Sequence, residues 1–482
     1  MLGGPPPALE TAPFANLRRA LDGLGDHTVR NTLLVVLAAT VAGYGSGFDP
    51  RVVVAGVAGL VLVSVILVNV TAGLMVFVFV AFLEFLPTTA GAPSMAKLVG
   101  LFLVIGWLGI VAVGRQDDRL SLDFLASSTA LSWMLVLFLG WVLASLLWAE
   151  DVGVAESTLL RYTLNFALFP IVFVAIRTPR HVASLYAVFI AGALFAAVVG
   201  MASSGGLSAG GDNGDSRLSG AGLNPNQLGA LLGVAAVLGG VLFCYRQLTT
   251  PVRILAAVGS CLCVVSLIMT GSRGALVGLV ASLAATPILV GRGRRLGATA
   301  LVICGGAASA VWVALVVPHD LLQRLIKSSG GGSGRVDLWT IGLRMFHDHP
   351  LTGVGAGNFP ITSIHYLLLP GRISYPQYII DQPKVTHNIY LQVIAELGLV
   401  GIALFGSMIL LSVIAGLKAT RAFQRQGDTG AELLTRGLLI ALTGLLVAYF
   451  FSSQLYGKQL YVLLALAPAL LGIARRGAEP SQ

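Results

Sequence analysis

Residues 129–149 read TALSWMLVLFLGWVLASLLWA, a run without a single charged side chain. A helix needs about 20 mainly apolar residues to cross the hydrocarbon core of a bilayer, so this run predicts a membrane-spanning helix. Apolar runs of this kind recur along the whole chain. The sequence therefore predicts an all-α polytopic integral membrane protein, in which the thickness of the bilayer sets the length of each element.

The composition agrees with that fold class. Of the 482 residues, 56% are hydrophobic and only 11% are charged, whereas soluble domains carry about 25% charged residues. This excludes a cytosolic globular enzyme and also a disordered, collagenous or nucleic-acid-binding chain. The net charge of +9 is then first a signal of membrane topology and only second a signal of an acidic ligand.

Apolar runs between charges and Gly or Pro breaks mark fourteen candidate spans. The first three are short or closely spaced and one pair could be re-entrant, so we expect 12–14 transmembrane helices. The candidate spans are 31–46, 52–69, 71–87, 96–114, 129–149, 161–177, 182–202, 224–245, 252–270, 274–291, 296–317, 388–417, 433–453 and 458–475.

Lys and Arg residues orient these spans. With the N-terminus inside, eighteen of the 30 basic residues lie in short inner segments, as the positive-inside rule requires. No cleavable signal precedes the first helix, which is expected to remain as an anchor. The predicted order is a cytoplasmic N-terminal segment (1–30), a transmembrane bundle (31–317), one long periplasmic loop containing helices (318–387), C-terminal transmembrane helices (388–475) and a cytoplasmic tail (476–482).

Two arginines at predicted helix starts fall on the outer side, where topology does not require them. Arg217 precedes Asn224-Pro225-Asn226, in which Asn224 suits an N-cap and Pro225 the first helical position. An ordinary capped helix start accounts for Asn224 and Pro225. It does not account for Arg217, because the positive end of a helix disfavours a nearby cation.

Arg273 lies in the tight turn Thr270-Gly271-Ser272-Arg273-Gly274 between two predicted spans. Ser272 can cap the following helix, so this arginine too stands beside a positive helix end. An anion shared by the arginine and the helix end would relieve that repulsion. The alternative, with equal weight, is an arginine whose side chain snorkels to the lipid headgroups.

A third helix start follows Thr386-His387-Asn388, with Thr386 as the expected N-cap. Asn388, Gln392 and Glu396 recur every four residues and make one polar stripe on an otherwise apolar helix. Such a stripe faces the bundle interior or a wet cavity. Hydrogen bonding between helices explains Gln392 and Glu396 equally well. His387 lies at the outer boundary, where a titratable base is reachable.

The long loop carries further candidates. A helix is predicted to run through Phe346, with its apolar residues at Leu338, Ile341, Met345 and Phe346, lying on the membrane surface or capping the bundle. Arg335 is a candidate for a third phosphate contact. Gly353-Val-Gly355 lacks the preceding strand that a dinucleotide fingerprint needs, so we reject that interpretation. The two histidines at 347 and 349 have the wrong spacing for a metal on one helix face.

The ordered set of these motifs resembles the O-antigen ligase and O-antigen polymerase superfamily of polytopic membrane glycosyltransferases, over about residues 200–402. The motifs that carry the resemblance are Arg217…Asn224-Pro225-Asn226, Ser272-Arg273-Gly274, Gly334-Arg335…Trp339…Pro350-Leu-Thr-Gly353-Val-Gly355…Phe359, and His387-Asn388…Leu391…Gly398…Gly401. Ligases of this kind usually have twelve spans.

The resemblance implies a bacterial inner-membrane enzyme with its active site facing the periplasm. It would move a glycan from an undecaprenyl pyrophosphate-linked donor to a sugar hydroxyl, as in O-antigen ligation to lipid A-core in lipopolysaccharide biosynthesis. By position, Arg217 and Arg273 match the pyrophosphate-binding arginines of the family and His387 its essential histidine. The resemblance implies no metal ion and no cofactor, and membrane lipids rather than nucleic acid as further partners.

Two alternatives stay open from the sequence. A polymerase of polysaccharide repeat units uses the same chemistry with a glycan as acceptor. A membrane transporter would instead place its site near the midplane, between broken and usually repeated helices. The sequence shows no convincing internal repeat, and its candidate residues cluster at one face, which favours the glycosyltransferase.

Overall fold

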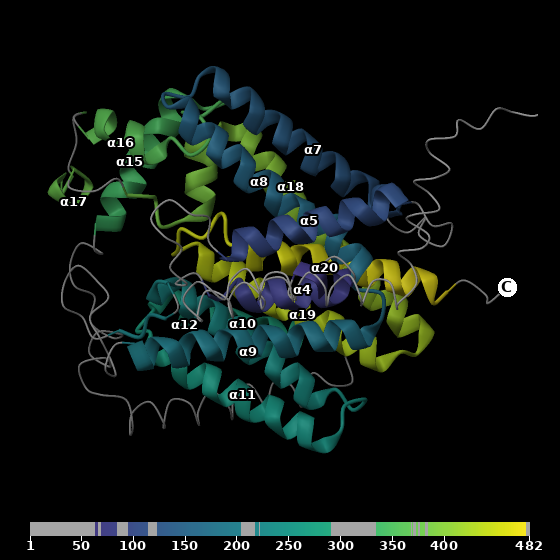
Figure 1. Cartoon of the computed structure of the whole chain (residues 1–482). Coiled ribbons are helices and arrows are strands. Elements are labelled where there is room, and N and C mark those ends of the chain that lie inside the picture. Colours follow the sequence, from purple (N-terminus) through teal and green to yellow (C-terminus); the bar gives the residue numbers. More distant parts are fainter. Residues whose placement is uncertain are drawn as a thin grey trace, which may run out of the picture. The chain divides into compact units, whose positions relative to one another are not determined.

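The computed structural model describes most of the chain from residue 69 onward. The described residues are 63–65, 69–83, 95–113, 123–203, 217–220, 222–290, 334–367, 369, 373–374, 376–380 and 384–478. They form helices without strands, apart from one isolated bridge between Gly220 and Leu223. The chain divides into two compact units, Met1–Asn69 and Val70–Gln482, and helices α4 to α20 belong to the second (Figure 1).

Eight helices of the described residues are long and apolar enough to cross a membrane. They are α7 (Thr129–Ala144, continued by the 3-10 helix η2, Ser145–Leu147), α8 (Val152–Ala175), α9 (Pro179–Ser203), α10 (Pro225–Cys244), α11 (Thr250–Met269), α18 (Ile389–Gln426), α19 (Thr429–Tyr449) and α20 (Lys458–Arg476). Three further apolar helices are α4 (Val70–Val80), α5 (Met95–Val113) and α12 (Arg273–Leu289). The predicted all-α polytopic membrane protein is confirmed.

These helices coincide with eleven of the fourteen predicted spans. The other three, 31–46, 52–69 and 296–317, lie outside the described residues except for 63–65 and 69, so the total of 12–14 stays a prediction. The predicted span 161–177 began too late, because α8 starts at Val152. The Asp151 side chain caps that start by accepting the N–H of Val154 at 3.0 Å.

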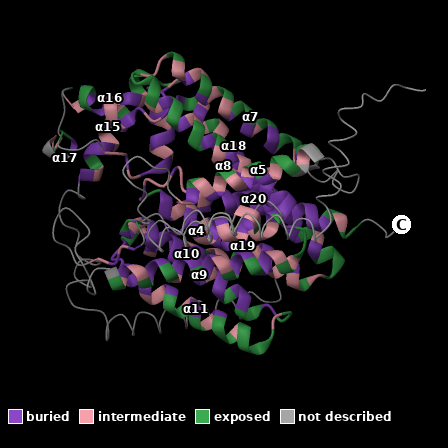
Figure 2. Ribbon diagram, in the orientation of Figure 1, coloured by how far each residue is buried: buried purple, intermediate pink, exposed green. Residues whose placement is uncertain are grey.

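The burial pattern suits a bundle surrounded by lipid (Figure 2). Of the most apolar stretch of α20, 89% of the residues are buried inside the protein, against 33% for α7 and for α11. The outer helices therefore expose large apolar side chains, such as Leu255 and Trp133, at 70% and 59%. Contiguous apolar surface of that kind is rare on water-soluble monomers and is expected where the neighbour is lipid.

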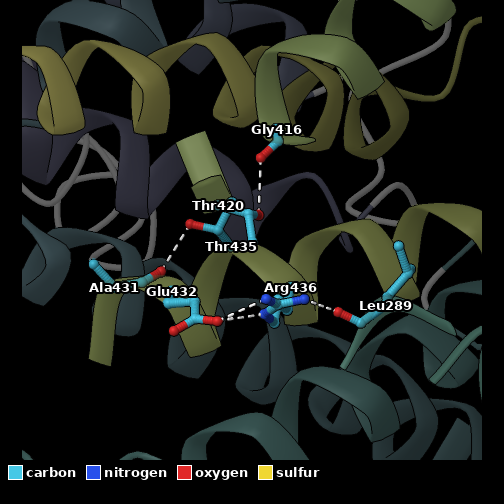
Figure 3. A network of polar contacts seen from close by, with 7 residues as sticks. All are labelled: Leu289, Gly416, Thr420, Ala431, Glu432, Thr435 and Arg436. Carbon is cyan, nitrogen blue, oxygen red and sulfur yellow. Dashed lines mark hydrogen bonds and ion pairs between the residues drawn. The ribbon is translucent and has the colours of Figure 1, made fainter. Parts of the chain in front are cut away.

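Helices α12 and α19 pack side by side and run antiparallel, which fixes which helix ends share one end of the bundle. At one end, Gly274 at the start of α12 approaches Phe451, just beyond α19. At the other end, Arg436 near the start of α19 donates to the carbonyl oxygen of Leu289, the last residue of α12, and pairs with Glu432 at 2.7 Å (Figure 3).

Other contacts show which further helix ends lie together at each end of the bundle. Gln426 at the end of α18 donates to Ala474 near the end of α20 at 2.6 Å, and Tyr186 donates to Leu434 at 2.8 Å. Val241 near the end of α10 packs against Gly437 near the start of α19, and α18 ends just before α19 begins. The starts of α10, α12 and α18 therefore share the end opposite the Arg436–Glu432 pair. The side of the membrane that each end faces stays a prediction.

Helix α18 is broken at Gly398, whose φ of 66° and ψ of −163° are not helical. A short half-helix therefore carries Asn388, Gln392 and Glu396, and the longer remainder, 399–426, is long enough to span a bilayer by itself. A loop following α15 supplies partners for the backbone groups at the break: Val354 N–H to Ala395 O at 3.0 Å, Gly355 N–H to Glu396 O at 2.9 Å, and Leu399 N–H to Pro350 O at 2.8 Å.

The segment between α12 and α18 contains helices, as predicted. These are α15 (Arg335–Asp348), α16 (Phe359–Leu367) and α17 (Pro376–Ile380). Helix α15 packs on α18 and buries Leu338, Ile341 and Met345 completely in a small apolar core with residues such as Phe359 and Ala395. This helix caps the half-helix of α18 rather than presenting its apolar face to lipid headgroups.

Candidate functional site

The segment carrying Arg217 lies directly against the turn that carries Arg273. The N–H of Leu218 donates to the carbonyl oxygen of Met269 at 3.0 Å, and Arg217 Nε donates to Thr270 O at 2.9 Å. A second guanidinium nitrogen of Arg217 donates to Asn226 Oδ1 at 3.1 Å. One fork-shaped side chain thus ties the start of α10 to the start of α12.

Asn226 joins the two turns from the other side. Its Oδ1 accepts a hydrogen bond from the Ser272 hydroxyl at 3.0 Å as well as the bond from Arg217. Ser272 caps α12 by accepting the N–H of Ala275 at 3.3 Å, as predicted. Asn224 caps α10 by accepting the N–H groups of Asn226 and Gln227 at 3.1 and 2.9 Å, also as predicted.

Two glycines permit this close approach. A Cβ on Gly229 of α10 would lie 2.8 Å from Thr270 Oγ1 and 2.9 Å from the Ala275 side chain, tighter than ordinary contacts. Gly271 has a φ of 59°, which only glycine adopts without cost. The two helix starts can therefore touch. Arg273 is exposed at the first position of α12, three residues after the Thr270 carbonyl to which the half-buried Arg217 donates.

His387 adopts a left-handed backbone conformation, with φ 53°, the one described residue other than glycine with positive φ. Such a conformation costs free energy and persists only where the surroundings enforce it. Its N–H donates to Ser453 Oγ at 2.8 Å, and its ring Nδ1 lies 3.2 Å from the same oxygen. The predicted cap at Thr386 was wrong, because Asn388 caps α18 by accepting the N–H groups of Tyr390 and Leu391.

Thr386 has a different role in the same turn. Its hydroxyl donates to the Asn388 carbonyl oxygen at 2.7 Å, and its own carbonyl oxygen accepts the Trp339 indole N–H at 3.0 Å. Trp339 belongs to α15, so this bond fixes α15, with Arg335 at its first position, beside the turn that carries His387.

The histidine and the arginine turn are linked through the segment that follows α19. In this segment, Phe451 packs so closely against Gly274 that a Cβ on the glycine would lie 2.7 Å from the Phe451 side chain. Two residues later, Ser453 binds His387. The three helix starts that carry Arg217, Arg273 and His387 consequently converge at one end of the bundle.

The surroundings of His387 keep its ring neutral. Burial, followed by the positive charges of Arg335 and Lys384, lowers its pKa from 6.5 to about 4. This places Arg335 and Lys384 within electrostatic reach of the ring. A neutral imidazole beside arginines can accept a proton while the arginines attract an anion.

The polar stripe of α18 points away from solvent. Gln392 and Glu396 are 2% and 0% exposed, and Gln392 Nε2 donates to Glu396 Oε1 at 3.0 Å. The other carboxyl oxygen accepts the Gly357 N–H at 2.9 Å and lies 3.5 Å from the Tyr456 hydroxyl. These contacts give Gln392 and Glu396 a structural role, which is to hold the loop after α15 on the half-helix.

The structure thus brings most predicted site residues together and separates some. Arg217, Asn226, Ser272 and Arg273 form one cluster. His387 with its cap Asn388 is joined to that cluster through the segment after α19. Gln392 and Glu396 lie deeper on α18 and hold the loop. Asn224 caps α10 with an exposed side chain.

Sequence reasoning missed Ser453 and Phe451. Both stand at the end of an apolar run, where one hydroxyl and one aromatic ring have no distinctive pattern. Nothing in a single sequence pairs Ser453 with His387, 66 residues earlier. In the sequence, Ser452-Ser453 at the end of a predicted span was the one available sign of a polar contact there.

In the part of the chain that the structure describes, no group of three or more His, Cys, Asp or Glu side chains is placed to hold a metal ion. His347 and His349 are exposed, in agreement with the expected surface position.

A comparison with protein families identifies part of the chain. Residues 255–406 match the family model described as O-Antigen ligase. The matched region contains Arg273, Arg335 and His387, whereas Arg217 precedes it. The match confirms the resemblance on which the sequence analysis relied. No curated protein matches the chain.

Proposed function

Because residues 255–406 carry an O-antigen ligase domain in a chain that crosses the membrane many times, we propose that this protein is a glycosyltransferase of the ligase type. Its donor is a glycan linked to undecaprenyl pyrophosphate, and its acceptor is a sugar hydroxyl of lipid A-core. The site faces the periplasm from the bacterial inner membrane. The observation that supports this most is the convergence of the Arg217, Arg273 and His387 helix starts.

The chemistry assigned to these residues is a single displacement without a metal ion. His387 takes the proton of the acceptor hydroxyl, and the acceptor oxygen attacks the anomeric carbon of the donor sugar. The bond from that carbon to the pyrophosphate oxygen breaks, and its electron pair leaves with the polyprenyl pyrophosphate. Attack from the opposite face inverts the anomeric centre.

The arginines act on the leaving group. Negative charge grows on the pyrophosphate as the bond breaks, and fixed guanidinium groups stabilise that charge more strongly in the transition state than in the bound donor. Arg273, Arg217 and the helix ends beside them supply that stabilisation, and Arg335 is a third contact. Asn226 and Ser272 hold the two turns that present the arginines, while Asn388 holds the start of the helix behind His387.

The direct test uses purified protein in lipid, with a lipid-linked glycan and lipid A-core. We expect His387→Ala and Arg273→Ala to abolish transfer, since loss of one transition-state donor typically costs about 10²–10³ in rate. His347→Ala, an exposed histidine of the same segment, is the matched control and should keep full activity. Transfer at the wild-type rate by either site variant would contradict the proposal. Strong inhibition by EDTA would favour a metal-dependent mechanism instead.

A polymerase of repeat units is the second candidate, because it needs the same site with a different acceptor. Deleting the gene distinguishes the two. If the protein is a ligase, all attachment to lipid A-core is lost and lipid-linked polymer accumulates. If it is a polymerase, single repeat units remain attached.

A further inference from the structure

Ser453 makes an unusual pair of contacts with one residue. Its hydroxyl oxygen accepts the backbone N–H of His387 at 2.8 Å and lies 3.2 Å from Nδ1 of the same histidine. Both residues are half-buried, and they come from separate helix ends, since Ser453 follows α19 and His387 precedes α18. The two contacts hold the backbone and the ring of His387 at once.

Ser453 engages Nδ1 of the ring, so Nε2 is the ring nitrogen left for the acceptor substrate. A hydroxyl oxygen has two lone pairs and one proton, and the backbone N–H of His387 occupies one lone pair. If Nδ1 carries the ring proton, it donates to the second lone pair. Nε2 is then unprotonated and is the nitrogen available as a base. In the opposite tautomer, Nδ1 accepts a hydrogen bond from the Ser453 hydroxyl. Nε2 then carries the ring proton and cannot act as a base.

The segment after α19 is itself anchored on several elements. Phe450 stacks edge-on against Trp339 of α15, with ring centroids 5.6 Å apart, and Phe451 packs on Gly274. Farther along, the Tyr456 carbonyl oxygen accepts a hydrogen bond from Asn165 of α8 at 3.3 Å. The position of Ser453 is therefore fixed relative to both the arginine turn and α15.

We propose that Ser453 is a positioning residue for the transfer reaction, which holds His387 in the tautomer with the proton on Nδ1 and aims Nε2 at the acceptor hydroxyl. This rests on the proposed function. Ser453 touches neither the donor nor the acceptor in this role. The charged groups that face the His387 ring are Arg335 of α15 and Lys384 of the preceding segment. Neither can accept a hydrogen bond from Nδ1–H, whereas the Ser453 hydroxyl can.

The kinetic test compares Ser453→Ala with Ser453→Thr, which keeps a hydroxyl. We expect Ser453→Ala to lower kcat by about 10- to 100-fold, as loss of an orienting partner typically does, and to leave the KM for the lipid-linked donor within about twofold, because the arginines bind that substrate. Ser453→Thr should restore most of kcat. Ser452→Ala, which changes the neighbouring buried serine, controls for disturbance of the segment and should retain activity.

Wild-type kcat in Ser453→Ala overturns the inference while inactivity of His387→Ala leaves the proposed function intact. Equal losses in Ser452→Ala and Ser453→Ala also overturn it, because the effect then belongs to the segment as a whole. If His387→Ala is fully active, the proposed function itself fails.

A second measurement does not depend on transfer. Nitrogen NMR of protein labelled at histidine, with His387 assigned by its absence in His387→Ala, reports which ring nitrogen carries the proton. We expect the proton on Nδ1 in the wild type and a mixture of tautomers in Ser453→Ala. A proton on Nε2 in the wild type would overturn the inference.

Discussion

Arg217 donates through Nε to the carbonyl oxygen of Thr270 at 2.9 Å, although 53 positions of sequence separate the two residues. The same guanidinium also reaches Asn226 Oδ1 at 3.1 Å. Arg217 therefore has two roles in the proposed site. It contributes positive charge, and it joins the turn that carries Arg273 to the start of α10.

This double role predicts that charge alone will not replace Arg217. Lysine keeps the positive charge but presents a single point instead of a planar fork, so Arg217→Lys cannot bond to both Thr270 and Asn226. We expect the rate of glycan transfer to fall by about tenfold or more. Arg253→Lys is the control, because Arg253 donates to the Phe243 carbonyl at the other end of α10. Equal rates for Arg217→Lys and wild type would refute the joining role.

The pH dependence of transfer should report the environment of His387. The proposed base acts when neutral, so activity is present above its pKa and is lost as the pH falls through it. Because that pKa is lowered to about 4, kcat/KM should stay flat well below the usual histidine range near 6.5 and decline only near pH 4. A decline centred near pH 6.5 in the wild type would contradict this.

Substituting Arg335 should shift the pH at which kcat/KM declines, which is the acid limb of the pH profile. Arg335→Gln removes a positive charge that disfavours the protonated ring, so the His387 pKa should rise and the decline in kcat/KM should move to higher pH. The position of the limb is the readout, because the rate itself falls if Arg335 also binds pyrophosphate. Arg344→Gln, on the same helix, should leave the limb in place.

The break in α18 should be sensitive to any side chain at Gly398. An added Cβ would overlap the carbonyl oxygen of Leu351. The backbone conformation at φ 66° and ψ −163° is essentially restricted to glycine and costs other residues about 1–3 kcal/mol. We expect Gly398→Ala to lower the thermal unfolding temperature in detergent. Gly406→Ala changes the same helix where nothing lies within 4 Å, so it should be neutral or stabilise by up to about 1 kcal/mol. Similar unfolding temperatures for the two variants would contradict a required break.

The Arg436–Glu432 pair should affect stability without affecting the proposed site. Both side chains (Figure 3) are mostly buried, with 16% and 15% of their surface exposed. They lie near the start of α19, whereas Ser453 follows its end. We expect Glu432→Gln to reduce the free energy of unfolding by about 1–3 kcal/mol, since a charged hydrogen bond is lost. Transfer per folded molecule should be unchanged at a temperature where the variant is folded. A selective loss of transfer would show that this end communicates with the site.

The sequence by itself determined the local features of this protein. Apolar runs without charge located eleven helices of the described chain, because a span in lipid must be long and apolar whatever its neighbours are. Caps at Asn224 and Ser272 were also predictable, since they depend on hydrogen bonds across two or three residues. The early start of α8 was missed because Glu156 and Arg161 interrupt its apolar run. The cap at Asn388 was missed because Thr386, two positions earlier, is also a residue type that caps helices.

Only the tertiary structure decided which helix starts are neighbours. Hydropathy fixes the length of a span but not its position in the bundle, because lipid is as apolar as the side chains that pack there. The contacts of Arg217 with Thr270, Phe451 with Gly274 and Ser453 with His387 join segments that are distant in the sequence. They depend on small residues such as Gly229 and Gly274 that let helix ends approach closely, and such proximity is a property of the packed bundle rather than of any one segment.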